Sequence, residues 1–163
     1  MNTTAYELSA QNPKPARVIF WGGLIAGALD ITGACVVAWL RAGVPPKNVF
    51  QSVASGLYGP TSSQLGWKSA AIGLALHFFI ATVWTAVYFA ASRSITFLLG
   101  QPLVSGVLYG IIVYSFMNFV VIPLSAIPKR ATPPPLSSRL IGLSIIILCI
   151  GIPIAFIVRK FSK

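Results

Sequence analysis

The sequence predicts an all-α polytopic membrane protein, a bundle of four transmembrane helices, from its composition and from the length of its apolar runs. Of the 163 residues, 56% are hydrophobic and only 9% are charged, whereas soluble domains carry about 25% charged residues. Four apolar runs are close to or longer than the roughly 20 residues that a helix needs to cross a bilayer. Hydrocarbon offers no partner for a free backbone N–H or C=O, so each run is predicted to be a helix.

The four runs define one domain. The predicted spans are 18–40, 69–92, 102–127 and 140–158. They belong to a single transmembrane domain over residues 17–163, which follows a polar tail at residues 1–16. Basic residues flank most of the spans rather than forming one patch, so the net charge of +10 indicates anionic lipid headgroups as partners and not nucleic acid.

The orientation in the membrane is left open by the positive-inside rule. If both termini lie on one side, the Lys and Arg residues divide equally between the two sides of the membrane. The rule gives an orientation only where one side carries more Lys and Arg residues than the other. The basic cluster after Val158 favours cytoplasmic termini. A dual-topology dimer is the alternative.

A short helix is predicted at residues 46–57, between the first two spans. Prolines open this segment, as the first turn of a helix tolerates, and apolar side chains then recur at helical spacing against polar ones. We expect this helix to be amphipathic and to lie in the membrane interface. A re-entrant half-helix is the alternative, although Lys47 and Gln51 favour the surface.

Small residues surround the ionisable residues inside the spans. Asp30, one of only two acids in the chain, shares a helix face with Gly23 and Gly27, and the single histidine, His77, follows Gly73 by one turn. Stripes of small residues face other helices, because they let backbones approach closely. In the third span a similar ridge is formed by Gly106, Gly110, Tyr114 and Asn118.

Four polar residues are predicted to share one depth in the membrane. At 1.5 Å per residue, Asp30, His77, Asn118 and Cys149 each lie about 12 to 15 Å from the face that carries the loop after the first span. We therefore predict an Asp30–His77 pair, with Asn118 as a further partner, that either shares a proton or ionises together. Cys149 and Cys35 are not expected to form a disulfide, because a thiol inside a span behaves as a small hydrophobe.

Two prolines are predicted to break their helices near this layer. Pro123 has no N–H for the carbonyl of Phe119, and Pro153 has none for the carbonyl of Cys149. Carbonyls released at mid-depth bind ions in some transporters. The two carbonyls are therefore added to the predicted partners of the Asp30–His77 pair.

Several stretches of the chain resemble one family. GLIAG at 23–27, the later VPP, ALHFFIATVWTAVYFAASR in the second span and GVLYGIIVYSFMNFVVIPLSAIP in the third are similar to the YagU-like inner-membrane proteins of bacteria. The resemblance covers about Gly23 to Pro135 and implies a multi-pass protein of a bacterial plasma membrane. It implies no reaction, ligand or catalytic residue for this chain. The chain departs from that family in the shorter segment between the first two spans and in the acid at Asp30.

The residues favour a protein that is not an enzyme. One histidine excludes a two-histidine haem within the chain, no G-x-S-x-G turn is present, and neither a cofactor nor a metal is predicted. We expect a structural or accessory role, as a homo-oligomer or within a larger membrane complex. The alternative is a small proton-coupled transporter or channel that uses Asp30 and His77.

Overall fold

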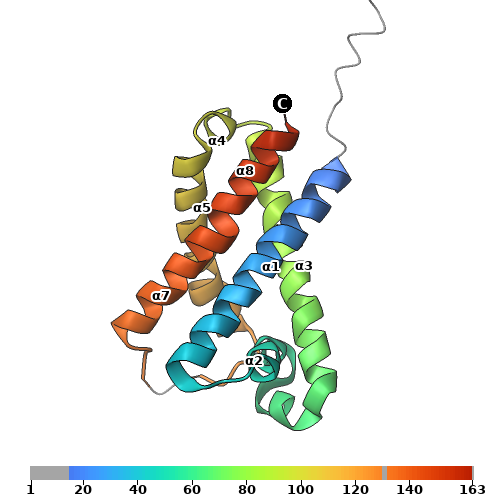
Figure 1. Ribbon diagram of the computed structural model, residues 1–163, viewed down its shortest axis with the longest axis vertical. Coiled ribbons are helices and arrows are strands. Elements are labelled where there is room, and N and C mark those ends of the chain that lie inside the picture. The colour runs from blue at the N-terminus through green and yellow to red at the C-terminus, as the bar shows by residue number, and fades with distance from the viewer. Residues whose placement is uncertain (1–14, 130–131, 163) are drawn as a thin grey trace, which may run out of the picture.

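The computed structural model describes residues 15–129 and 132–162, and it is all-helical within those ranges, without a strand. Four helical stretches are long and apolar enough to cross a membrane: Pro15–Ala42, Pro46–Ser92, Pro102–Leu124 and Leu136–Phe161. Figure 1 shows the start of α1 (Pro15–Ala42) and the C-terminal end of the chain at the same end of the molecule. We call this the terminal end, and the opposite end the loop end.

The helices extend beyond most of the predicted boundaries. α1 begins at Pro15, so it includes the last residues of the predicted tail, whose residues 1–14 lie outside the described ranges. α3 (Gly66–Ser92) begins before the predicted span at residue 69. The third stretch ends at Leu124 rather than at residue 127, because the backbone becomes extended at Ser125. α7 (Leu136–Ile146) begins directly after Pro135, four residues ahead of the predicted span.

A helix, α2 (Pro46–Tyr58), occupies the segment where the sequence predicts a short helix, and a 3₁₀ segment, η1 (Gly59–Leu65), joins it to α3. α2 lies at the loop end beside α3 (Figure 1). Gln51, which the sequence groups with the polar residues of this helix, is buried within the protein and only 6% exposed. η1 folds back over this residue, and the Gln51 side-chain amide donates to the Gly66 carbonyl at 2.8 Å.

The two prolines do not interrupt their helices abruptly. A π-helical turn, η2 (Met117–Val121), follows α5 (Pro102–Phe116) and leads into α6 (Ile122–Leu124), which contains Pro123. A second π-helical turn, η3 (Ile147–Gly151), lies between α7 and α8 (Ile152–Phe161), which contains Pro153.

The wider turns explain how the helical path continues. The N–H of Ile122 bonds to the Met117 carbonyl, and the N–H of Ile152 bonds to the Ile147 carbonyl. A wider turn gives the proline ring more room from the preceding carbonyls, which it would meet in a regular α-helix. The expected helix breaks are therefore π-helical turns placed just before each Ile-Pro pair.

Glycines bring the helices into close contact. A Cβ atom at Gly23 would lie 2.7 Å from the Cα of Thr82 in α3, and a Cβ at Gly106 would lie 2.8 Å from the Cα of Ile152 in α8. Such approaches are too close for any residue except glycine. The predicted packing glycines all lie at helix contacts: Gly23 and Gly27 on α3, Gly73 on the backbone of α2 at Phe50, and Gly106 and Gly110 on the segment that contains Gly151.

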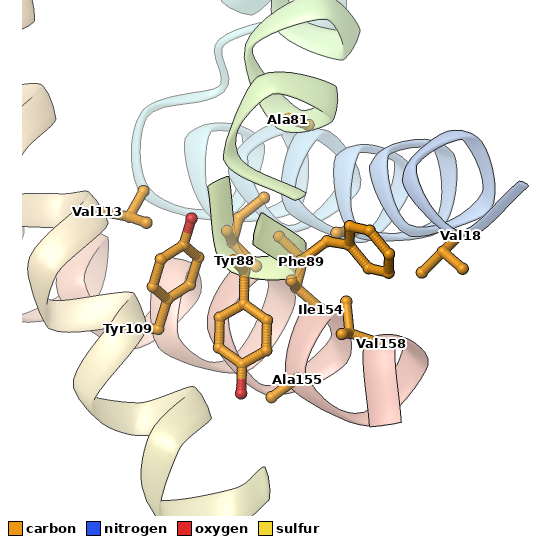
Figure 2. Close-up of a cluster of buried hydrophobic side chains, with 11 residues drawn as sticks. Val18, Ala81, Tyr88, Phe89, Tyr109, Val113, Ile154, Ala155 and Val158 are labelled. Atoms are coloured by element: carbon orange, nitrogen blue, oxygen red, sulfur yellow. The ribbon is translucent and has the colours of Figure 1, made fainter. Parts of the chain in front are cut away.

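The apolar core lies where α1, α3, α5 and α8 meet toward the terminal end. Figure 2 shows Val18, Tyr88, Tyr109, Ile154 and Val158 converging from these four helices. Val18, Tyr88, Ile154 and Val158 are fully buried. A short helix that the sequence analysis does not predict, α4 (Phe97–Gly100), covers this end between α3 and α5.

Replacing Gly106 with alanine should destabilise the bundle. The added methyl group would push against the backbone of α8, and such overpacking costs about 1 to 3 kcal/mol. Gly100→Ala is the matched control, because a Cβ there meets nothing within 4 Å. Unfolding in mixed micelles, followed by circular dichroism, measures both variants, and equal stabilities would contradict the packing described here.

Candidate functional site

The side chain of His77 links α3 to the backbone of α1. Its Nε2 lies 2.9 Å from the carbonyl oxygen of Gly27. A carbonyl can only accept a hydrogen bond, so Nε2 carries the proton and donates it. The bond joins two residues that are fifty positions apart in the sequence, and it ties the middle of α3 to the middle of α1.

Gly27 makes this bond geometrically accessible. A Cβ atom at Gly27 would lie 2.8 Å from Cδ1 of Phe78 and 3.2 Å from the Cβ of Ala81. Glycine on one helix and alanine on the other therefore allow the two backbones to approach closely. Without this approach the imidazole could not reach across to a main-chain oxygen of α1.

The structure places Asp30 beside His77. Oδ2 of Asp30 lies 3.9 Å from Nε2 of His77, and the two side chains are 18% and 13% exposed. This separation is within the range of an ion pair but beyond that of a hydrogen bond. The proton on Nε2 is therefore directed at the Gly27 carbonyl, while the carboxyl group lies next to the imidazole without being bonded to it.

Both side chains line a cavity between the helices. The cavity has a volume of about 130 Å³ and is partly open. Every helical stretch that is long enough to cross a membrane contributes to its wall, and α2 contributes Val53. The lining residues are Asp30, Val53, His77, Ile80, Ala81, Trp84, Val113, Met117, Ile146 and Ile150.

The structure does not bring Asn118 to this pair. Its side-chain amide donates to the carbonyl of Tyr114 one turn earlier in the same helix, at 2.8 Å. Met117 lines the cavity instead, because consecutive residues of a helical turn point in directions roughly a quarter of a turn apart. Tyr114 also lies outside the cavity lining, and its ring comes within 3.5 Å of the Cβ position of Gly142 in α7.

Cys149 takes a separate position on the neighbouring helix. Its sulfur lies 3.6 Å from the position that a Cβ would take at Gly33, one turn after Asp30 in α1. The next residue, Ile150, reaches the cavity. Cys149 and Cys35 are both free thiols, and Cys149 serves as a packing residue between η3 and α1.

A buried polar cluster at the terminal end is missing from the sequence-based interpretation. The hydroxyl of Tyr88 lies 2.8 Å from Oγ of Ser105 and donates to the Leu98 carbonyl at 3.0 Å. Tyr109 donates through its hydroxyl to the Trp84 carbonyl. Figure 2 shows the two tyrosine rings side by side with their hydroxyl groups pointing in opposite directions.

The signal for this cluster is present in the sequence. Ser105 and Tyr109 stand one residue before Gly106 and Gly110, so they form the neighbouring ridge of the same helix. The glycine ridge packs on η3 and the start of α8, and the neighbouring ridge of Ser105, Tyr109 and Val113 is buried as well. Hydroxyl groups on a buried face need partners, and that requirement could have identified the cluster.

Removing the Tyr88 hydroxyl should weaken the fold. Tyr88→Phe deletes one donor from a fully buried cluster, with an expected loss of about 1 kcal/mol in the free energy of unfolding. Tyr58→Phe is the control, because Tyr58 is 40% exposed and should change stability by less than about 0.5 kcal/mol. The two variants would be compared by unfolding in mixed micelles, and a loss no larger for Tyr88→Phe than for Tyr58→Phe would contradict the role of the cluster.

Comparison with known proteins gives no relative for the chain: no family model, no curated protein and no solved structure matches it. The similarity to YagU-like proteins therefore stays a prediction. The roles of Asp30 and His77 must be inferred from the contacts that these side chains make.

Proposed function

We propose that this chain is an integral membrane protein of a bacterial plasma membrane, with four spans and a non-catalytic structural or accessory role. The apolar surface of the four stretches supports the membrane location. Large apolar side chains on their outer faces remain exposed in the isolated chain, as expected for surfaces that contact acyl chains. Examples from each stretch are Phe20, Phe79, Ile112 and Leu148.

The loop end of the bundle fits the membrane interface. The Nζ of Lys47 lies 5.4 Å from the centre of the Trp67 ring, and tryptophan and lysine are both favoured where headgroups meet hydrocarbon. We place α2 in this interface, with Lys47 toward anionic headgroups. The buried Gln51 attaches α2 to α3, so the short helix belongs to the bundle and not to a free loop.

The observation that carries the structural role is the His77–Gly27 hydrogen bond. Bonds between helices inside a bilayer contribute about 0.6 to 2 kcal/mol each. His77 makes such a bond at the level of the cavity, where α1 and α3 also meet through small residues. We propose that His77, with Asp30 beside it, acts as a clasp that fixes α1 against α3.

A proton-coupled transporter or channel is the second candidate. The cavity that contains both Asp30 and His77 favours it. A proton pathway, however, needs further polar groups on both sides of the pair, and every other residue that lines the cavity is apolar or aromatic. The contacts of the pair therefore support the clasp more strongly than the relay.

An accessory role also implies a partner within the membrane. A homo-oligomer or a larger membrane complex would use part of the exposed apolar surface. Anionic lipids at the basic flanks complete the proposed partners. Purification in a mild detergent, followed by identification of the proteins and lipids that remain bound, would separate these partners.

Replacing His77 with phenylalanine tests the clasp. This change keeps a ring but removes the donor to the Gly27 carbonyl, and we expect a loss of about 0.6 to 2 kcal/mol in stability. Asn118→Leu is the matched control, because Asn118 donates only within its own helix, and its effect should stay below about 0.5 kcal/mol. Unfolding in mixed micelles measures both variants.

Two results would reject the clasp. One is a His77→Phe variant that is as stable as Asn118→Leu. The other is a proton flux in proteoliposomes that Asp30→Asn abolishes while leaving the stability unchanged, which would establish the transporter instead.

Reporter fusions test the proposed orientation. The start of α1 and the end of α8 both lie at the terminal end, which we propose to be cytoplasmic, so alkaline phosphatase fused after Phe161 should be inactive and a fluorescent protein fused there should fluoresce. Phosphatase fused after Gly43, at the loop end, should be active. The reverse pattern would place the termini outside, and activity at both positions would indicate dual topology.

A further inference from the structure

We propose that the cavity beside Asp30 and His77 is a binding site for a small organic cation, a protonated amine with a compact apolar body. This ligand site goes beyond the clasp. The hydrogen bond of the clasp joins Nε2 of His77 to the Gly27 carbonyl, whereas the ligand would be bound by the carboxyl group of Asp30, which that bond does not use, and by the rest of the cavity wall.

The polar end of the cavity offers acceptors. Among the described residues, none donates a hydrogen bond to either carboxyl oxygen of Asp30, and Nδ1 of His77 makes no hydrogen bond. The proton on Nε2 is already donated to the Gly27 carbonyl. A ligand that completes this arrangement must therefore bring N–H donors, and a positive charge matches the ionised form of the carboxyl group.

The remainder of the wall is apolar and contains one indole. Trp84 is held by edge-to-face contacts with Phe116, whose ring centre lies 5.4 Å away, and with Tyr109, at 6.0 Å. The face of an indole attracts cations, most strongly where water is excluded. The aliphatic residues of the wall suit the apolar body of the ligand: Val53, Ile80, Ala81, Val113, Met117, Ile146 and Ile150.

The same wall disfavours metal ions. Calcium takes six to eight oxygen ligands, and magnesium requires a nearly ideal octahedron. The cavity supplies one carboxyl group, and no cluster of three or more metal-binding side chains occurs in the part of the chain that the structure describes. A primary ammonium group has only three N–H donors and therefore needs fewer acceptors than these metal ions, and the wall accommodates its apolar body.

The volume sets the size of the ligand. A buried cavity of roughly 150 Å³ binds benzene in another protein, and this cavity has a similar volume of about 130 Å³. A single six-membered ring with one amino group therefore matches the site. Cyclohexylammonium is the corresponding probe, and cyclohexanol is a neutral ligand of nearly the same shape.

The test uses the fluorescence of Trp84 in the full-length protein. The chain has four tryptophans, and Trp21, Trp39 and Trp67 are 43%, 58% and 71% exposed, so phenylalanine can replace these three. In detergent micelles, cyclohexylammonium should change the Trp84 emission saturably. Cyclohexanol should bind about tenfold more weakly, because it lacks the charge that Asp30 and Trp84 recognise.

Two variants locate the binding. Asp30→Asn removes the carboxyl group that would pair, as a carboxylate, with the ammonium group, and should weaken the binding of cyclohexylammonium by about tenfold or more. Val53→Phe narrows the cavity from α2 without changing a polar group, and should weaken the binding of both compounds. Asn118→Leu, outside the cavity lining, should leave the binding unchanged.

The proposal is overturned by any of three results with folded protein. These are the absence of a saturable change, equal binding of the amine and the alcohol, and unchanged binding in Asp30→Asn. The comparison of amine with alcohol needs no variant in the cavity, so a variant that fails to fold cannot obscure it. Failure here leaves the clasp intact, because the stability of His77→Phe tests the clasp independently of any ligand.

Discussion

The close approach of α1 to α3 is the contact on which the polar centre of this protein depends. Gly23 and Gly27 place the backbone of α1 against Thr82, Phe78 and Ala81 of α3. Only at this separation can the imidazole of His77 donate to a main-chain oxygen of the other helix. Asp30, one turn after Gly27, is then brought beside the same imidazole. The pair and the cavity that it lines thus follow from the small residues that surround them.

A hydrogen bond from a side chain to the backbone of another segment occurs at three levels of the bundle. At the loop end Gln51 donates to the Gly66 carbonyl, in the middle His77 donates to the Gly27 carbonyl, and at the terminal end Tyr88 donates to the Leu98 carbonyl. In each case a side-chain donor is satisfied by a backbone acceptor of another segment. Surroundings that offer no water make such partners necessary, and a carbonyl has a second lone pair for this purpose. These bonds connect α2, α1 and α4 to α3, so α3 is the helix to which the others are attached.

The sequence predicts the four helical stretches and the packing glycines well, because both depend on local rules of length and residue size. The position of Asp30 beside His77 also follows from small-residue stripes and equal depth. Asn118 shows the limit of that reasoning. Its depth in the membrane predicts that Asn118 lies at the level of the Asp30–His77 pair, but the helix directs Met117 toward the cavity. The rotation of the helix about its axis determines which of these two neighbouring residues faces the cavity. The fold-back of η1 over Gln51 is equally a tertiary arrangement that no local pattern contains.

The composition of the chain makes the central contact directly measurable. His77 is the single histidine, and Asp30 is the single aspartate, so ¹⁵N-histidine and ¹³C-aspartate label only these two side chains. Solid-state NMR in lipid bilayers can then measure the dipolar coupling between the imidazole nitrogens and the carboxyl carbon. With Nε2 and Oδ2 at 3.9 Å, we expect clear dephasing, together with a ¹⁵N shift of a protonated Nε2. The absence of dephasing would show that the two groups are apart in the bilayer, and that the approach of α1 to α3 does not bring them together.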